Sequence, residues 1–569
     1  PVSGRMILRS KKEENRIISI INNAGFVLNS QKKLYLKDDK SVSRFIFEYL
    51  PHLTTLAEIY YTKEFKQLTQ KRSLTPFVQY HPHSNLLSID FLLNDLDASA
   101  LLKALEAYRA SRHYIRLKDG QFLAIDDKRS QETLKMLDDL HVDMKQMHDG
   151  ILTLSLSQAF YLNEHLSDTK DFDESFHQFI ERFYHPDAHP YSLPNGLQAD
   201  LRTYQKTGYQ WLKTLSDYQL GGILADDMGL GKTLQTITYL LDEVQHNHKP
   251  NLVVAPSSLI FNWQDEIKRF APSLKACVIS GTQTDRSSQL SQADQYDILI
   301  TSYPLLRRDS QVYREMIFNC CILDEAQYIK NANSLNARAA KQIQAKKRFA
   351  LTGTPMENAL SELWSIFDFI LPGYFSNYHH FHQKYEIPIR RDEDQETQQL
   401  LANQIKPFIL RRMKQEVLDE LPEKTETKIT VEMTPRQKNV YQALLLEAKQ
   451  LLDQKINQDG FEKSKLLMLN LMTRLRQVCC HPKLYLESYD GESGKLNTLL
   501  ELIKEAIQSH HKILVFSQFT SMLALIKEAL ELNEITYSYL DGQTPVANRT
   551  ELVQQFNQGE TPVFLISLK

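Results

Sequence analysis

The chain has 569 residues, more than one hydrophobic core can organise, so its length predicts about three or four domains. Its hydrophobic fraction of 42% and charged fraction of 24% are typical of a soluble globular protein, and no apolar run is long enough to span a bilayer, which argues against a membrane partner. The net charge of −3 excludes a global electrostatic attraction to nucleic acid, so any such contact must come from local basic groups.

The five cysteines indicate neither a disulfide framework nor a structural zinc site, because none of them shows the C-x₂-C spacing of zinc ligands. This usage fits a reducing compartment and predicts a cytoplasmic protein. The chain starts at Pro1 without an initiator methionine or a signal-peptide pattern, so we expect it to be a fragment of a longer protein. The cysteines are Cys277, Cys320, Cys321, Cys479 and Cys480.

Residues 1–195 mix strand and helix patterns. The run 86–91 predicts a strand, and residues 98–105 predict a helix. Residues 114–125 predict a β-hairpin that turns at an Asp-Gly pair. We therefore expect an α+β accessory region without a catalytic site. Its histidines lack metal-ligand spacing, and we interpret three of them as surface residues: His141, His148 and His165.

A proline-containing segment, residues 185–195, predicts a linker, and short apolar strands alternate with helices after it. Strands are expected within 252–255, 297–303 and 349–355. Short apolar strands between helices indicate a buried parallel sheet. Thr, Ser, Gly and Pro stand at their carboxyl ends, the side on which such sheets bind ligands.

The sequence Asp-Asp-Met-Gly-Leu-Gly-Lys-Thr, residues 226–233, is the strongest single motif. It follows the apolar run 222–225 and precedes a predicted helix at 234–241, which is the order strand, glycine-rich loop, helix. Such a loop directs its backbone N–H groups at a phosphate chain, with Lys232 on the β- and γ-phosphates and Thr233 on Mg²⁺. The predicted nucleotide-binding residues of the loop are Asp227, Met228, Gly229, Leu230, Gly231, Lys232, Thr233 and Leu234.

The phosphate loop has Asp226 where the common pattern has glycine, but an acidic pair further along the chain supports its assignment as a nucleotide-binding loop. The pair, Asp324 and Glu325, ends the apolar strand 320–323. Nucleotide-binding sheets place their metal carboxylate and their water-activating carboxylate at such a strand end. We expect ATP and Mg²⁺ as cofactors, with Asp324 on the metal and Glu325 on the attacking water, and Lys232 as the third catalytic residue.

The next part of the chain is predominantly helical, with helical apolar spacing at 441–452 and 465–478. A second domain of strands and helices starts near Lys495. Its first clear strand is expected at 511–518 and a later one at 561–567.

Together these motifs resemble a SWI/SNF-type ATPase of helicase superfamily two, of the bacterial type with an accessory N-terminal region. Segment 201–212 resembles the adenine-recognition motif, in which Gln205 would contact the adenine edge with Arg202 close by. Loop 226–233 resembles motif I. The acidic pair resembles motif II, with Gln327 where the family more often has His. Further matches follow in the family's order: 256–263 (motif Ia), 351–358 (motif III), 408–414, 421–424, 475–482, 515–518 (motif IV) and 539–542.

The resemblance implies an α/β fold of RecA-like P-loop motor lobes, each a parallel sheet flanked by helices. It divides the chain into an accessory α+β region at 1–195, a first lobe at 196–373, a helical family-specific insertion at 374–490 and the start of a truncated second lobe at 491–569. The chain ends where motif V would begin and lacks motif VI with its arginine finger. Loss of such an arginine can cost about 10³–10⁵ in turnover, so we expect these residues to bind nucleotide but to hydrolyse it poorly.

The resemblance also implies an ATP-dependent translocase on double-stranded DNA that remodels protein–DNA complexes in the bacterial nucleoid. Ser257, Ser302 and Thr354 would lie at the DNA phosphates, where contacts position the protein without reading sequence. Arg411 and Arg412 would add charge there, or would instead form a solvated or lobe-bridging turn.

Two other functions stay open. One is a strand-separating DNA or RNA helicase of the same superfamily. The other is a nucleotide-gated scaffold with slow turnover, whose residues 1–195 bind a protein partner. Trp263 and Trp364 have apolar neighbours at helical spacing, and we interpret both as core residues.

Overall fold

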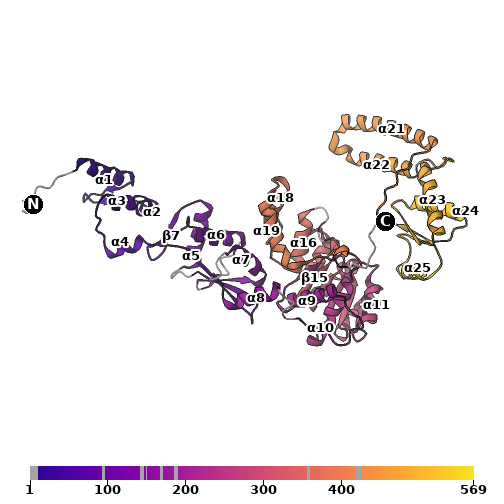
Figure 1. The fold of residues 1–569 in the computed structure, drawn as a ribbon, viewed down its shortest axis with the longest axis horizontal. Helices are drawn as coiled ribbons and strands as arrows, with labels where there is room; N and C mark the ends of the chain where they lie inside the picture. The colour runs from indigo at the N-terminus through magenta and orange to yellow at the C-terminus, as the bar shows by residue number, and fades with distance from the viewer. Residues whose placement is uncertain are drawn as a thin grey trace, which may run out of the picture. The chain divides into compact units, whose positions relative to one another are not determined.

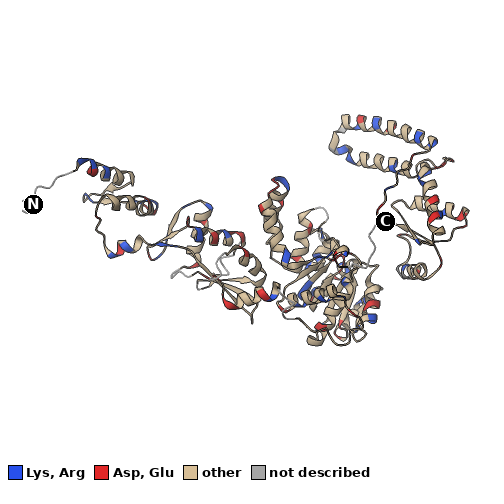
Figure 2. Ribbon diagram, in the orientation of Figure 1, with Lys and Arg blue, Asp and Glu red and all other residues tan. Residues whose placement is uncertain are grey.

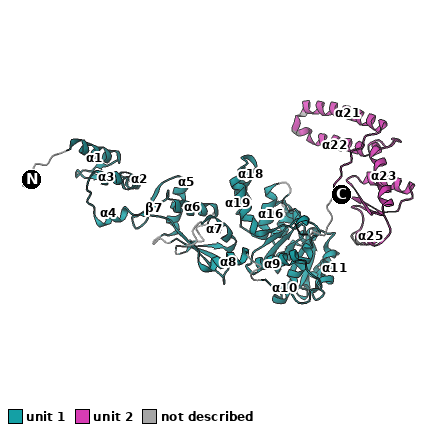
Figure 3. Ribbon diagram, viewed as in Figure 1, with its two compact units in different colours: residues 1–419 teal, residues 420–569 magenta. Residues whose placement is uncertain are grey.

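The structure is a computed structural model, and it describes residues 10–91, 96–140, 142, 147–148, 150–166, 171–184, 190–354, 356, 359–417 and 425–568. The predictions for His141, for the first part of the linker at 185–189, for three residues of motif III (Pro355, Glu357 and Asn358) and for segment 421–424 lie outside these residues. The chain forms two compact units, residues 1–419 and 420–569 (Figure 3).

The accessory region of the first unit is the predicted α+β structure. Its main sheet has the order β4-β5-β9-β8 with antiparallel pairing. Gly120 has a φ of 86° in the turn of the predicted hairpin, a conformation that favours glycine. The elements are β4 (Pro76–His81), β5 (Leu86–Phe91), β8 (Met147–His148), β9 (Ile151–Ser155), the hairpin strands β6 (Tyr114–Arg116) and β7 (Phe122–Ala124), α5 (Ala98–Arg109), α6 (Lys128–Leu140), α7 (Ala159–His165) and α8 (Glu174–Tyr184).

The part of the first unit that follows the accessory region is built on a seven-stranded parallel sheet in the order β12-β13-β11-β14-β15-β10-β16, with helices packed around it (Figure 1). The sheet confirms the parallel arrangement predicted from the short apolar runs. Strands β10, β11 and β13 are buried along their whole length because helices flank the sheet. The strands are β10 (Gly222–Leu224), β11 (Asn251–Ala255), β12 (Ala276–Val278), β13 (Ile298–Ser302), β14 (Ile317–Leu323), β15 (Gln344–Leu351) and β16 (Ile409–Leu410); the flanking helices include α9 (Thr203–Asp217), α10 (Lys232–His246), α11 (Ile260–Phe270) and α16 (Leu360–Ile370).

The segment 374–490, expected as one helical insertion, is divided between the two units. Its first part packs in the first unit as α18 (Ile387–Arg391), α19 (Gln395–Ile405) and strand β16. Strand β16 extends the sheet, because Ile409 and Leu410 pair in parallel with the phosphate-loop strand β10. The division between the units therefore lies inside this segment rather than at its ends.

The second unit begins with a helical hairpin of α21 (Pro435–Asp459) and α22 (Phe461–Cys480), which confirms the helical spacing there. A three-stranded parallel sheet follows, with β19 (Val563–Ser567) between β17 (Ile513–Ser517) and β18 (Tyr537–Leu540). Among the described residues of both units, no helix is long and apolar enough to cross a membrane.

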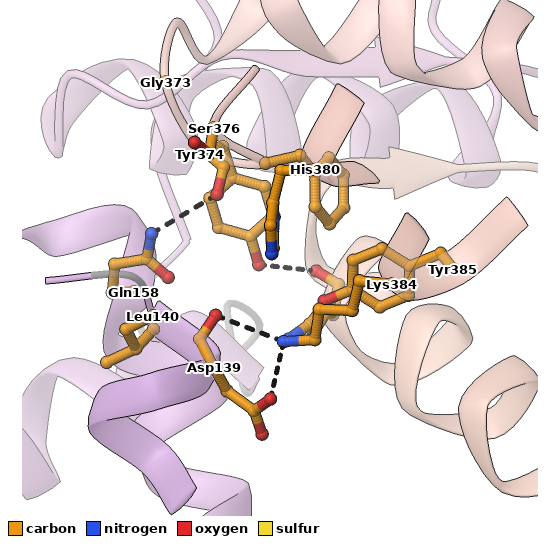
Figure 4. A pocket seen from close by; sticks show the side chains of 11 residues that line it. Asp139, Leu140, Gln158, Gly373, Tyr374, Ser376, His380, Lys384 and Tyr385 are labelled. Carbon is orange, nitrogen blue, oxygen red and sulfur yellow. Dashed lines mark hydrogen bonds and ion pairs between the residues drawn. The ribbon is translucent and has the colours of Figure 1, made fainter. Parts of the chain in front are cut away.

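The end of helix α6 and Gln158, which precedes helix α7, line a small hollow together with residues of the helices that precede β16 (Figure 4). The Lys384 ammonium pairs with the Asp139 carboxylate at 2.9 Å and donates to the Asp139 carbonyl at 3.1 Å. The Tyr161 hydroxyl donates to the same carboxylate at 2.6 Å. Burial lowers the pKa of Lys384, and the Asp139 charge opposes that shift. The side chains around this small hollow satisfy one another, so it joins two parts of the first unit rather than forming a substrate site.

A buried charge cluster holds the amino-terminal side of the same sheet together. Glu243 of α10 pairs with Lys347 of β15 at 2.6 Å and with Lys213 of α9 at 3.3 Å. Its carboxylate also accepts hydrogen bonds from Asn319 at 3.0 Å and from Ser216 at 2.8 Å. Burial alone would raise the pKa of Glu243, but ion pairing and hydrogen bonding, foremost with Lys347, lower it to about 2.

We predict that Glu243→Gln destabilises the first unit at neutral pH by about 3 kcal/mol, the linkage value of a pKa lowered from 4.5 to about 2. Because the folded-state pKa is depressed, the carboxylate stabilises the fold above its ordinary pKa. This contribution is lost as the pH falls from that value towards 2. Urea unfolding followed by circular dichroism from neutral to acidic pH measures both effects. The exposed Glu315→Gln is the matched control, and equal loss in the two variants would contradict the assignment.

Candidate active site

The phosphate loop joins strand β10 to helix α10 at the carboxyl edge of the sheet. Helix α10 begins at Lys232, with Gly231 as its N-cap residue. Gly229 and Gly231 have φ values of 85° and 74°, which let the backbone curl around the helix N-terminus. Lys232 and Thr233 thus lie in the first helical turn, whose N–H groups have no partner within the helix and suit a phosphate.

The Lys232 ammonium lies inside the curl of this loop. It donates to the carbonyl oxygens of Asp226 at 2.7 Å and Asp227 at 3.3 Å. Burial lowers the pKa of Lys232, while the nearby carboxylates, first that of Glu325, oppose the shift. A cation that is held over the loop and faced by the acidic pair is well placed for the terminal phosphates of a nucleotide.

Asp324 directly follows strand β14, at the same carboxyl edge of the sheet as the phosphate loop. Its backbone N–H continues the pairing of β14 with β11 by donating to the Val254 carbonyl at 2.8 Å. Its carboxylate accepts a 2.8 Å hydrogen bond from the indole Nε1 of Trp263. Burial raises the pKa of Asp324, and the Trp263 bond opposes that shift. Trp263 is buried as expected for a core residue, but the sequence did not reveal that it orients the candidate metal ligand.

Glu325 starts a chain of hydrogen bonds that leads away from the nucleotide site. Its backbone has a φ of 49°, which is uncommon for a residue other than glycine and often marks a functional site. The Gln327 amide donates to the Glu325 carboxylate at 2.8 Å and accepts from the Thr352 hydroxyl at 3.0 Å. The Thr354 N–H donates to the same hydroxyl at 3.1 Å. Motif II is thus joined to the loop after β15.

The adenine-recognition residues lie beside the phosphate loop. Gln205 is 7% exposed and donates to the Leu230 carbonyl at 3.3 Å. Its side-chain oxygen accepts from the backbone N–H of Arg202 at 3.0 Å. Arg202 is the exposed N-cap residue of α9. Helix α9 and the loop are therefore close enough to act on one nucleotide.

The predicted nucleic-acid contacts are in different environments. Ser257, Thr354 and Arg411 are exposed, the first two in the loops after β11 and β15. Ser302, in contrast, is only 2% exposed at the end of β13, so its hydroxyl does not fit the expected phosphate contact. Arg412 also departs from that expectation, because its guanidinium is ion-paired with the fully buried Asp226. Lysine and arginine are otherwise spread over many elements of the first unit (Figure 2).

The side chains at this site are suited to bind a nucleotide together with Mg²⁺. Mg²⁺ is usually held by one or two carboxylates together with substrate phosphates. The buried Asp324 carboxylate, which the Trp263 indole holds by a hydrogen bond, and the Thr233 hydroxyl supply such a set. The described residues contain no cluster of three or more His, Cys, Asp or Glu that would hold a metal by itself. The metal when bound would neutralise phosphate charge, and the protein residues would orient it.

Sequence comparisons show the family of the chain. Residues 204–484 match the family described as SNF2-related domain. Residues 1–194 match the bacterial SNF2 helicase associated family, and residues 494–569 match the helicase conserved C-terminal domain. The chain belongs to the SNF2 family. The accessory region, which carries no motif of the ATPase, is thus also part of a known SNF2 arrangement.

The chain is 38% identical over 382 residues to the ATP-dependent helicase MG018 of Mycoplasma genitalium, which covers 66% of this chain and 36% of that protein. It is 34% identical over 487 residues to the ATP-dependent helicase/translocase YwqA of Bacillus subtilis, covering 82% and 52%. The chain therefore spans about a third to a half of the length of these relatives. A solved structure, the Sulfolobus solfataricus SWI2/SNF2 ATPase core in complex with dsDNA, is 34% identical over 66% of this chain and 80% of that chain, with a TM-score of 0.40.

We predict that Trp263→Phe weakens Mg²⁺-dependent binding of a fluorescent ADP roughly tenfold, because it removes a hydrogen bond to a charged group. Titrating Mg²⁺ at fixed nucleotide concentration measures the loss. Trp364→Phe is the matched control, since Trp364 is buried in α16, where its ring contacts Tyr378 and Lys341. Equal effects of the two substitutions would show that the indole bond does not orient Asp324.

Proposed function

We propose that this chain is the motor of an ATP-dependent translocase on double-stranded DNA that hydrolyses ATP to ADP and phosphate and remodels protein–DNA complexes. Lys232 and the first turn of α10 bind the phosphates. Asp324 and Thr233 hold Mg²⁺, and Glu325 positions or deprotonates the attacking water. Gln205, with Arg202 beside it, is assigned to the adenine.

The hydrogen-bond chain from Glu325 through Gln327 and Thr352 to Thr354 carries this proposal. It connects the residue assigned to the attacking water with an exposed loop at the carboxyl edge of the sheet. A motor needs such a connection, because each nucleotide state must change the affinity of the motor for DNA. The name helicase/translocase of the Bacillus subtilis relative is consistent with it.

The remaining assignments concern partners. Backbone N–H groups and hydroxyls at Ser257 and Thr354, with Arg411 adding charge, are the proposed contacts to DNA phosphates; such contacts position the protein without selecting a sequence. The accessory region, residues 1–195, is the proposed site for a protein partner. The region has its own sheets and helices, and its core is continuous with that of the motor lobe. A partner bound to it would therefore move along DNA together with the motor.

We expect ATP turnover by the full-length protein to be stimulated chiefly by duplex DNA and to disappear in Lys232→Ala. Steady-state phosphate release is measured with duplex DNA, single-stranded DNA, RNA or no nucleic acid. Stimulation chiefly by a single strand or RNA would instead favour a strand-separating helicase. Absence of stimulated turnover would favour the nucleotide-gated scaffold.

In the full-length protein, Gln327→Ala should leave ADP affinity within about twofold of wild type while lowering duplex-stimulated turnover about tenfold. The amide is outside the phosphate loop but supplies two hydrogen bonds, each worth about 1 kcal/mol, to the connecting chain. Fluorescent-ADP binding and phosphate release are measured on the same samples. The exposed Gln342→Ala is the control, and retention of full stimulation by Gln327→Ala would contradict the connection.

A further inference from the structure

Arg412 makes an unusual set of contacts for a residue next to the junction of the two units. Its side chain is 12% exposed. Nε donates to the Asp226 carboxylate at 2.9 Å, and Nη2 bonds the second oxygen of the same carboxylate. Nη2 also donates to the Gln235 side-chain oxygen at 2.8 Å, and Nη1 donates to the Tyr204 carbonyl. One guanidinium therefore touches the phosphate loop, helix α10 and the adenine-recognition segment.

The groups around Arg412 form a buried polar cluster beneath the phosphate loop. Asp226 and Gln235 are fully buried. The Gln235 amide donates to Asp226 at 3.2 Å and lies 3.3 Å and 3.4 Å from the carbonyl oxygens of Leu230 and Gly231. These carbonyls belong to the end of the phosphate loop that leads into helix α10. The cluster thus reaches the loop backbone itself.

Helix α9 leaves room for this cluster by having glycine at position 208. A Cβ atom at Gly208 would lie 1.7 Å from the Gln235 side-chain oxygen and 2.9 Å from Arg412 Nη2. No side chain fits there unless the cluster moves. The close approach of α9 to the cluster is therefore built into the sequence at Gly208.

The backbone that carries Arg412 is fixed on both sides of β16. Upstream, the fully buried Phe408 packs on Phe160 of the accessory region, with ring centroids 5.3 Å apart. Along the strand, Ala225 N–H donates to the Leu410 carbonyl at 2.7 Å, and Asp227 N–H donates to the Arg412 carbonyl at 3.0 Å. Arg412 is therefore held in register with the first residues of the loop.

We propose that Arg412 is a positioning residue that holds the phosphate loop in its nucleotide-binding form. This deepens the proposed function and rests on it, because it concerns the nucleotide site of the same motor. The planar guanidinium supplies several donors in a fixed arrangement, so it bonds one carboxylate bidentately and still reaches two further oxygens. Asp226, which replaces the usual glycine of the loop, is in this account the attachment point for Arg412.

Removal of the guanidinium has two consequences that can be separated. It leaves the buried Asp226 charge unpaired, which destabilises the fold. It also releases Gln235, and through it the loop carbonyls, which weakens nucleotide binding. Replacing Asp226 by Asn at the same time removes the first effect, since no buried charge remains, but does not restore the second.

The test measures fluorescent-ADP binding with Mg²⁺ and the thermal midpoint without nucleotide, using the full chain. Arg412→Ala should weaken binding about tenfold or more, as loss of a charged hydrogen-bond group predicts. The double variant Asp226→Asn/Arg412→Ala should regain a midpoint near that of wild type yet still bind at least about fivefold more weakly. Gly208→Ala, which displaces the cluster without changing a charge, should also weaken binding. The exposed Arg391→Ala is the control.

The proposal is overturned if Arg412→Ala is folded and binds within about twofold of wild type. It is also overturned if affinity recovers together with the midpoint in the double variant, because Arg412 would then have only a structural role. Failure of the wild-type chain to bind the nucleotide would be a different result: it would remove the nucleotide site, and with it the proposed function on which the inference rests.

Discussion

Parallel strand pairing is the constraint on which the site depends. Parallel strands end at the same edge of a sheet, so residues far apart in sequence meet there. Strand β10 leads into the phosphate loop, β14 into the acidic pair and β15 into Thr352, and these strands lie close together in the order β11-β14-β15-β10. Backbone hydrogen bonds continue the pairing past the strand ends, from Asp324 to Val254 and from Thr352 to Leu224. The edge is therefore rigid where the chemistry is expected.

Two polar networks use this edge for different purposes. One lies beneath the phosphate loop, where Arg412 and Gln235 surround the buried Asp226. The other lies across the edge, where Gln327 joins Glu325 to Thr352. The first would set how tightly a nucleotide is held. The second would transmit what happens to the nucleotide. Separate networks allow binding and transmission to be changed independently by substitution.

Much of this arrangement followed from local sequence patterns. The loop at 226–233, the helix after it and the acidic pair each have a signature within a few residues, and the short apolar runs predicted the parallel sheet. What the sequence did not reveal depends on contacts between distant segments. The Arg412–Asp226 pair spans 186 residues, and the Trp263–Asp324 bond spans 61.

Two other differences between expectation and structure have local causes. Strand β16 has only two residues, too few for any periodicity, so the division of segment 374–490 could not be seen in advance. Ser302 was expected at the DNA phosphates from the family resemblance, but it is buried at the start of helix α13 (Tyr303–Arg308), for which it is the N-cap residue.

The central claim is that the nucleotide site and the DNA contacts are coupled. The most direct test measures the affinity of the wild-type chain for duplex DNA with and without a non-hydrolysable ATP analogue. Linkage requires that any change in DNA affinity is matched by the same factor in nucleotide affinity when DNA is added. We predict a several-fold change in both the DNA affinity and the nucleotide affinity of the wild type, and a much smaller change of both in Gln327→Ala. Identical DNA affinity with and without the analogue, in a chain shown to bind both ligands, would contradict it.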